Sequence, residues 1–513
     1  MRRCLPRPFR TRKIWADNSL DLWLIGGICF TCPKGLRMPA ENTRLTAQAE
    51  ALEAGFRHAL DHLNGLDHRS VAATRTPSEI RSRLSGHLPA PQLGEDPKRV
   101  VDALVDACEG GHLGSPSGRF FAWVIGGTLT SALAADWLAS AWDNNAVNQA
   151  CGPAACAVEE VAGGWIKSLL GLPTEASFAL TTGCQMAHAT ALAAARNALY
   201  AGIGHDVEVE GVSGAPPLTL LTNDQRHGSI DRAARLLGLG AKALVAIPTK
   251  GTGRISPEAL TQALIDHRGP KIVVLNAGDL NLGAFDDFAS LIPLAKAHGA
   301  WVHIDGAFGL WARVSPRFAP LVAGVELADS WATDAHKWLN TPIDCGLAFV
   351  KDEAAHRRAM AFRVSYITAA AEGRDPMDFT PEWTRRGRGF ALYAAVRELG
   401  QQGIAAMIER CCDLTKDLVE GLAQLPQCEV VAYPVLNQAL VRFTDPKGSD
   451  PDADDRRTDA MIAAINATGE AFFSGSTFGG RRVMRISLVN WRTSADDIRR
   501  TLACISDLAR NLT

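Results

Sequence analysis

The stretch KIVVLNAGDLNLGAFDDFASLIPLAKAHGAWVHID, residues 271–305, contains two strand-like runs with a helical segment between them. KIVVLNA and WVHID are short apolar runs, which is typical of strands buried on both faces of a sheet. FASLIPLAKAHG, residues 288–299, has the apolar spacing of an amphipathic helix. A strand, a crossover helix and a second strand predict two parallel strands of one sheet.

The same alternation extends in both directions along the chain. Further strand-like runs are FALTT, LTLLT, ALVAIP and GLAFV, and SIDRAARLLGL is a helical segment between two of them. Strands and helices in alternation predict an α/β domain with a mostly parallel sheet covered by helices on both faces. Ligands of such sheets bind beyond the carboxyl ends of the strands. We expect this large domain over residues 120–389 and any chemistry at that edge.

The flanking regions have other patterns. Residues 38–119 are expected to be helical, and residues 390–513 read as an α+β domain with a long helix, two strands and a closing helix. Within residues 1–37, the opening stretch MRRCLPRPFRTRK contains six basic side chains and no acidic one. The apolar run LWLIGGICF follows at residues 22–30. At nine residues this run is shorter than the ~20 that span a bilayer. We interpret residues 1–37 as a disordered extension or as sequence upstream of a start at Met38.

Composition limits the class of protein. The 513 residues are 47% hydrophobic and 21% charged, with a net charge of -2, so no basic field favours nucleic acid or an anionic membrane as a partner. The cysteines are scattered, and the pair Cys29 and Cys32 has no second pair at zinc-site spacing. We therefore expect no metal, no nucleic acid and no membrane partner, and free thiols in the reducing cytoplasm.

The most informative stretch is DSWATDAHKWLNTPIDCGLAFV, residues 329–350, in which Lys337 stands between His336 and Trp338. Taken alone, Lys337 could be an ordinary surface lysine. Asp305 lies 32 positions earlier, at the carboxyl end of WVHID, and the small residues Gly306 and Ala307 follow it. A carboxylate there can bind a protonated pyridine nitrogen, and a small neighbour leaves room for a flat ring. The alternative for Asp305 is a helix N-cap.

Two further segments have the same placement after a strand. His227, in NDQRHGSIDRAA, opens a helix, where an imidazole can stack on a ring or move protons. TTGCQMAHATALAAAR turns through Gly183 into a helix, whose first N–H groups can bind a phosphate. Each signal is weak in isolation, because a lone histidine is more often structural and many strand-to-helix turns contain a glycine.

A phosphate turn, a histidine, an aspartate and a lysine thus follow one another, each at a strand end. In this order the chain resembles the group II pyridoxal-dependent decarboxylases, which have the fold-type-I architecture of enzymes that use pyridoxal 5′-phosphate (PLP). The resemblance extends from about Phe120 to Ser506. It is carried by RFFAWVIGG, GPAACAVEE, TTGCQMAHATAL, DQRHGSI, NAGDLNLGAFDD, WVHIDGAFG, DSWATDAHKWLN and VMRISLVNWRT.

The resemblance implies PLP as cofactor and a homodimer with the active site at its interface. It implies that Lys337 is the Schiff-base lysine, that Asp305 pairs with the pyridine nitrogen, and that His227 stacks on the ring, with Ala307 beside it. The remaining implied residues are Gly183, Cys184, Gln185, Asp334 and His336 at the phosphate, and Trp123, Gly126 and Arg485 at the substrate.

The chain departs from the family in two places. Cys184, Gln185 and Met186 stand where small, hydroxylated or acidic residues are usual, so we expect backbone donors to hold the phosphate. The loop tyrosine that protonates the α-carbon in family decarboxylases has no counterpart between Tyr366 and Tyr393, where the segment 367–390 offers Phe379 and Trp383.

We predict decarboxylation of an L-amino acid to its amine and carbon dioxide. A PLP-dependent aldehyde synthase or aminotransferase is the alternative, and a catalytically silent PLP-fold protein is a third reading. A nucleotide-dependent dehydrogenase is disfavoured, because LLGLGAKAL lacks the dinucleotide spacing. The apolar segment RFFAWVIGG leaves aromatic, acidic and diamino acid substrates open.

Overall fold

The structure is a computed structural model that describes residues 22–25, 28–31, 41–86, 88–362, 373–445, 450 and 452–511. The chain divides into two compact units. The smaller unit comprises residues 1–62 and 76–109, and the larger unit comprises residues 63–75 and 110–513.

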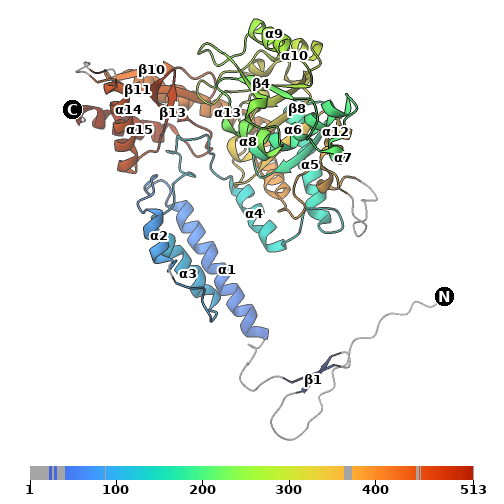
Figure 1. Ribbon diagram of the computed structural model, residues 1–513. Helices are drawn as coiled ribbons and strands as arrows, with labels where there is room; N and C mark the ends of the chain where they lie inside the picture. The colour runs from blue at the N-terminus through green and yellow to red at the C-terminus, as the bar shows by residue number, and fades with distance from the viewer. Residues whose placement is uncertain are drawn as a thin grey trace, which may run out of the picture. The chain divides into compact units, whose positions relative to one another are not determined.

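A seven-stranded sheet forms the centre of the larger unit (Figure 1). Its strands are β3 Ser177–Thr181, β4 Thr219–Asn223, β5 Leu244–Ile247, β6 Lys271–Asn276, β7 Trp301–Asp305, β8 Ser330–Asp334 and β9 Gly346–Val350. They follow the order β3-β9-β8-β7-β6-β4-β5, and only β9 runs against its neighbours. The mostly parallel α/β sheet expected from the sequence is confirmed.

Helices cover both faces of this sheet. The helices of this part are α4 Thr130–Trp142, α5 Pro153–Leu169, α6 Cys184–Ala201, α7 Val207–Glu210, α8 Gly228–Leu236, α9 Pro257–Asp266, α10 Phe288–Ala297, α11 Ala335–Trp338 and α12 Glu353–Met360. In β6, Ile272 and Val274 join an apolar cluster with α6 and α8. Val273 and Leu275 join another cluster with α9 and α10. Because successive side chains of a strand point to opposite faces, the two clusters lie on opposite sides of the sheet.

The C-terminal part of the larger unit contains a second sheet. Its elements are α13 Gly389–Ala423, β10 Cys428–Ala432, β11 Gln438–Phe443, α14 Ala453–Thr468, β12 Ser474–Phe478, β13 Arg481–Ser487 and α15 Ala495–Asn511. The strands are antiparallel in the order β10-β11-β13-β12. The expectation of two strands was wrong, since the structure has four and places α14 after the acidic loop. The partly exposed strand β12 has the sequence SGSTF, which contains few of the β-branched and aromatic residues that predict a strand.

The smaller unit has the helical character expected after Met38. Its helices are α1 Glu41–Asn64, which extends two residues beyond this unit, α2 Pro77–Arg83 and α3 Pro97–Cys108. Thr76 begins α2 in a capping box with Glu79, and Asp96 caps α3 ahead of Pro97. These local signals explain why both short helices begin where they do. The domain boundaries at residues 119 and 389 stay predictions.

The predicted N-terminal extension, residues 1–37, lies mostly outside the described residues. Within it the structure describes only two short antiparallel strands, β1 Leu22–Ile25 and β2 Ile28–Thr31. None of the helices in the described ranges combines the length and the apolar character that crossing a bilayer requires.

Candidate active site

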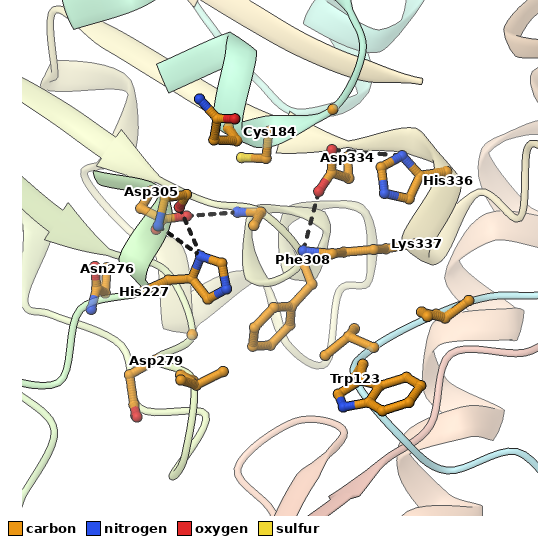
Figure 2. Close-up of a pocket in the computed structure, with 18 of the residues that line it drawn as sticks. Trp123, Cys184, His227, Asn276, Asp279, Asp305, Phe308, Asp334, His336 and Lys337 are labelled. Carbon is orange, nitrogen blue, oxygen red and sulfur yellow. Dashed lines mark hydrogen bonds and ion pairs between the residues drawn. The ribbon is translucent and has the colours of Figure 1, made fainter. Parts of the chain in front are cut away.

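A cavity of about 440 Å³ opens at the carboxyl ends of β6, β7 and β8 (Figure 2). Asn276, Asp305 and Asp334 are the last residues of these three strands, and all three line the cavity. The three strands are parallel neighbours, so their ends meet at one edge of the sheet. The topology therefore brings together three polar side chains that lie up to 58 positions apart in the sequence (276 to 334).

Eleven of the twelve site residues predicted from the sequence line this cavity. They are Trp123, Gly183, Cys184, Gln185, His227, Asp305, Ala307, Asp334, His336, Lys337 and Arg485. The twelfth, Gly126, lies behind the lysine segment, as described below. The roles assigned to these residues stay predictions, whereas their placement around one cavity is a finding of the structure.

Lys337 reaches the cavity from a tight turn after β8. The strand ends at Asp334, and the single helical turn α11 follows. Nζ of Lys337 lies 3.1 Å from Oδ2 of Asp334, and Nδ1 of His336 lies 3.7 Å from its Oδ1 (Figure 2). Burial lowers the pKa of Lys337, but the carboxylate of Asp334, which accepts a hydrogen bond from it, and that of Asp305 act against burial, and the pKa is raised overall. The free protein therefore holds Lys337 as an ammonium ion.

Asn340 fixes this turn from behind. Its Nδ2 donates to the carbonyl oxygens of Lys337 at 3.2 Å and Val489 at 2.9 Å, and its Oδ1 accepts from the N–H of Gly127 at 2.9 Å. A Cβ atom on Gly126 would lie 2.4 Å from the carbonyl oxygen of Lys337. Gly126 therefore permits close packing against the lysine segment, and the substrate contact expected for it stays a prediction.

Asp305 is a buried carboxylate that faces the cavity. Its Oδ1 accepts a hydrogen bond from the N–H of Ala307 at 3.2 Å and lies 3.5 Å from Nε2 of His188. Burial raises the pKa of Asp305, but His188, His227 and Lys337 together lower it well below its usual value. Asp305 thus stays ionised at neutral pH, and the small side chain of Ala307 leaves the space beside it open. This is the arrangement that a protonated ring nitrogen requires.

His227 caps the helix α8 with its ring. Nδ1 accepts from the N–H of Ser229 at 3.2 Å, so the proton of the neutral imidazole sits on Nε2. Burial lowers the pKa of His227, and Lys337, His188 and Arg485 lower it further, while Asp305 raises it. The side chain is therefore a neutral imidazole, suited to stacking on a ring.

The start of α6 can receive an anion. Gly183 precedes this 18-residue helix with φ 123°, a conformation that favours glycine. None of the described side chains caps the helix, so its first N–H groups remain available. Burial raises the pKa of the Cys184 thiol well above its usual value, so it stays protonated, and Nε2 of Gln185 lies 3.8 Å from the sulfur of Met186. Backbone donors thus dominate this end of the cavity.

Arg485 enters the cavity from β13 of the small sheet. It is 7% exposed, and its Nε donates to Oε1 of Gln438 at 3.1 Å. Burial lowers the pKa of Arg485 to about 10, and Asp279 acts against this shift. Asp279, also on the cavity wall, accepts three backbone N–H groups of its own loop at 2.7–3.0 Å. The guanidinium remains charged at neutral pH and can bind a carboxylate.

The wall formed by Trp123 and Val124 is apolar and strained. Both residues have positive φ, 59° and 60°, which is unusual for bulky side chains. The ring of Trp123 is 47% exposed and lies 5.8 Å from the ring of Phe120 and 5.6 Å from that of Phe472. Such strain persists only where the surroundings fix the backbone, and it is common at binding sites.

The residues present fit pyridoxal phosphate. Oδ1 of Asp334 and Oδ1 of Asn276 are buried without a hydrogen-bond partner among the described residues. The uncapped start of α6 suits a phosphate, Asp305 suits a protonated ring nitrogen, and Lys337 supplies an amine. A ligand that carries a phosphate, a protonated ring nitrogen and an aldehyde group would match these three features.

Sequence reasoning did not single out Asn276, Asp279, Val124 or Phe308, which also line the cavity. A signal for two of them was present, because NAGDLNLGAFDD follows the apolar run of β6 just as Asp305 ends β7. Phe308 and Val124 have ordinary apolar sequence surroundings, and only the folded chain distinguishes them from core residues.

The chain matches the model of the pyridoxal-dependent decarboxylase conserved domain over residues 88–444. It is 27% identical over 488 residues to an aromatic-L-amino-acid decarboxylase of Bacillus atrophaeus, covering 92% of this chain and 98% of the relative. It is 30% identical over 394 residues to an L-2,4-diaminobutyrate decarboxylase of Rhizobium meliloti strain 1021, covering 74% and 76%. The solved structure of Oryza sativa TDC with PLP and tryptamine matches with a TM-score of 0.85 at 22% identity, covering 93% of this chain and 99% of that one.

Proposed function

This chain belongs to the family of pyridoxal-dependent decarboxylases, and on that premise we propose that its substrate is an L-amino acid with an aromatic side chain. The enzyme is a PLP-dependent decarboxylase that releases an amine and carbon dioxide. The apolar lining of the cavity carries the proposal on the substrate. Its members are Trp123, Val124, Ile125, Leu280, Phe308 and Ile343. Burial against such side chains stabilises a flat apolar ring.

When bound, pyridoxal phosphate supplies an electron sink for the bonding pair that remains as carbon dioxide leaves. The side chain of Lys337 would hold its aldehyde carbon, and the N–H groups at the start of α6 would hold its phosphate. Asp305 would keep a proton on the ring nitrogen, because its lowered pKa leaves it the stronger acid of the pair. His227, a neutral imidazole, would lie against the ring.

Arg485 is proposed to orient the substrate. Its guanidinium is buried at the cavity wall and is a permanent positive charge at neutral pH. A carboxylate bound there is held by charge-assisted hydrogen bonds, which fix direction better than neutral ones.

Product analysis tests the proposal directly. The purified enzyme, loaded with PLP, is incubated with L-phenylalanine, L-tyrosine, L-tryptophan, L-glutamate and L-2,4-diaminobutyrate, and products are identified by mass spectrometry. Amines from the aromatic substrates, absent with Lys337→Ala, are expected. Amine from diaminobutyrate or glutamate alone would overturn the aromatic assignment and leave decarboxylation intact. No product from any substrate would favour the silent PLP-fold reading.

Phe379 is one of the two aromatic residues in the segment where the family's loop tyrosine has no counterpart, and a phenyl ring in its place would favour the aldehyde alternative, because it has no proton to donate. In the structure Phe379 is 2% exposed, and the guanidinium of Arg374 lies 4.2 Å from its ring centroid. It packs as a core residue beside Ala348 and Cys184. Phe379 therefore carries no argument for the aldehyde product. Residues 363–372, which include Tyr366, lie outside the described residues.

We propose the amine as product and Tyr366 as the residue to test. A phenol can donate a proton to a carbanion, whereas a phenyl ring cannot. If Tyr366 has this role, Tyr366→Phe shifts product from amine toward aldehyde and ammonia in air, and Tyr433→Phe serves as the matched control. An aldehyde as the main product of the wild-type enzyme would establish the alternative.

We propose a homodimer, as the resemblance implied. On α1 the side chains of Leu45, Leu52, Phe56 and Leu60 are 41–68% exposed. Their spacing of seven, four and four places them along one face of the helix. An exposed apolar stripe of this kind is typical of an interaction surface. Light scattering should give a mass twice that of a single chain. The double variant Leu52→Glu and Phe56→Glu should give a lower mass.

A cytoplasmic location is likewise proposed. Nine cysteines between Cys108 and Cys504 are free thiols in the structure, and several of them are buried. Free thiols are the usual state in a reducing compartment. Fractionation of the native host with an antibody would test the location.

A further inference from the structure

A chain of buried polar side chains runs from Asp305 away from the cavity. Nε2 of His188, on α6, lies 3.5 Å from Oδ1 of Asp305, and its Nδ1 lies 2.9 Å from Nε2 of His303 on β7. Nδ1 of His303 lies 2.9 Å from Oγ of Ser330, which accepts from the indole N–H of Trp301 at 2.9 Å. His188, His303 and Ser330 are all fully buried. Neither histidine has a role in the mechanism above.

The two ends of this chain determine which nitrogen carries each proton. The indole of Trp301 can only donate, so Ser330 accepts from it and can direct its own O–H to Nδ1 of His303. Burial, and the nearby His188, lower the pKa of His303 strongly, which makes its imidazole neutral. His303 then carries its proton on Nε2 and donates to Nδ1 of His188.

At the other end, the carboxylate of Asp305 can only accept. When Nδ1 of His188 accepts this hydrogen bond, its proton is on Nε2, which lies 3.5 Å from Oδ1 of Asp305 and 3.4 Å from Sγ of Cys184. The reverse order would turn a nitrogen lone pair toward the carboxylate, which is repulsive. In this order each of the four contacts has one donor and one acceptor, running from Trp301 toward Asp305.

We propose that His188 and His303 are positioning residues that act through Asp305. His188 supplies the carboxylate with an N–H donor, and His303 fixes the tautomer of His188 that can donate. Together they keep Asp305 ionised and aimed at the cavity. This inference rests on the proposed function, because it takes Asp305 as the partner of the cofactor's ring nitrogen.

A metal ion is the competing reading of the same cluster. Sγ of Cys184 lies 3.4 Å from Nε2 of His188, and one ligand atom each of Cys184, His188 and Asp305 lie within 4.8 Å of one another. A thiol must lose its proton to bind a metal well, and burial raises the pKa of Cys184 well above its usual value. The geometry of the hydrogen-bonded chain explains the cluster without an ion.

The test compares His188→Leu with His188→Gln. Leucine removes both hydrogen bonds, whereas the amide of glutamine offers one donor and one acceptor, as a neutral imidazole does. Tyr200→Phe is the control, since it removes one buried hydrogen bond, to the carbonyl oxygen of Pro216, from the same helix. The readouts are the PLP dissociation constant and the visible absorbance of the bound cofactor as a function of pH.

His188→Leu is expected to weaken PLP binding roughly 10-fold, the size of effect that outer hydrogen-bond partners commonly have. It should also move the pH-dependent absorbance change of the bound cofactor to lower pH, since a less well-placed Asp305 holds the ring proton less tightly. His188→Gln and Tyr200→Phe should retain both properties. His188→Leu with unchanged affinity and absorbance would overturn the proposal, as would bound metal in the wild-type protein.

A double-mutant cycle separates a positioning role from a merely structural one. If His188 acts through Asp305, adding His188→Leu to Asp305→Asn changes PLP affinity no further. Additive losses would show that His188 acts independently and would overturn the proposal. If Asp305→Asn by itself leaves affinity and absorbance unchanged, the proposed role of Asp305 fails instead. Should His188→Leu not fold, His303→Leu against His303→Gln repeats the comparison.

Discussion

The two walls of the cavity differ in how the chain holds them. On one wall Asn276, Asp305 and Asp334 end three hydrogen-bonded parallel strands and are at most 7% exposed. On the other, Trp123 is 47% exposed and Ile343 is 70% exposed, and both belong to segments outside the sheet. The first wall is polar and fixed, and the second is apolar, with a strained backbone at Trp123 and Val124.

This difference between the walls corresponds to two tasks, binding of the cofactor and recognition of the substrate side chain. Electrostatic interactions depend steeply on distance, so groups that bind a charged cofactor need the fixed spacing that a sheet provides. Apolar contacts are non-directional, so a wall that recognises a side chain can be built from loops. We infer that the sheet wall determines the reaction and that the wall around Trp123 determines the substrate.

The largest effect is expected for Lys337→Ala on the sheet wall. Without the amine the cofactor has no covalent attachment, so decarboxylation should fall on the order of 10⁴-fold. Absorbance spectroscopy would measure the covalent attachment of the cofactor, and an amine assay would measure decarboxylation. Retention of activity within tenfold of the wild type would remove Lys337 from its assigned role.

Asp305→Asn should have the next largest effect. An amide cannot keep the ring nitrogen protonated, so kcat/KM should fall roughly 100- to 1,000-fold. Because the pKa of Asp305 is lowered on folding, the carboxylate stabilises the folded state at neutral pH, and this contribution is lost as pH falls through its unfolded and then its folded pKa. Thermal unfolding at pH 7 and pH 4 would show a smaller pH dependence in the variant.

On the opposite wall, Trp123→Ala should alter substrate use and leave the cofactor in place. Loss of one aromatic wall is expected to lower kcat/KM for the preferred substrate about 10- to 200-fold. PLP affinity should stay within about twofold, and Trp123→Phe should lie close to the wild type. A large loss of PLP affinity in Trp123→Ala would mean that the two walls do not have separate tasks.

Asp334→Asn should have the smallest effect on turnover. In the wild-type protein Asp334 raises the pKa of Lys337, so the neutral amine that captures the cofactor forms only at high pH. Removing the charge lowers this pKa, and each unit gives about ten times more neutral amine near pH 7. The rate of PLP capture by the cofactor-free variant should therefore rise at lower pH. An unchanged pH profile, measured by stopped-flow absorbance, would contradict the assignment of this ion pair.

Sequence patterns located one wall much better than the other. Lys337, Asp305 and His227 each follow an apolar strand-like run, and the ends of parallel strands must meet at one edge. The packing of Gly126 against a carbonyl oxygen was not predicted, because a glycine that packs in this way and one that lines a pocket look alike in sequence. Phe379 had the sequence position of a loop residue and is in fact buried in the core.

The sequence by itself determined the α/β class and the order of the strands' functional ends, because periodicity and residues at strand ends are local properties, and the type of cofactor followed from its resemblance to a known family. Only the tertiary structure brought His188 beside Asp305 and His303, across 117 and 115 positions of the chain. It also revealed the strain at Trp123 and Val124 and the burial that holds His303 neutral. Contacts between distant segments, and the loss of water around them, arise only when the chain is packed.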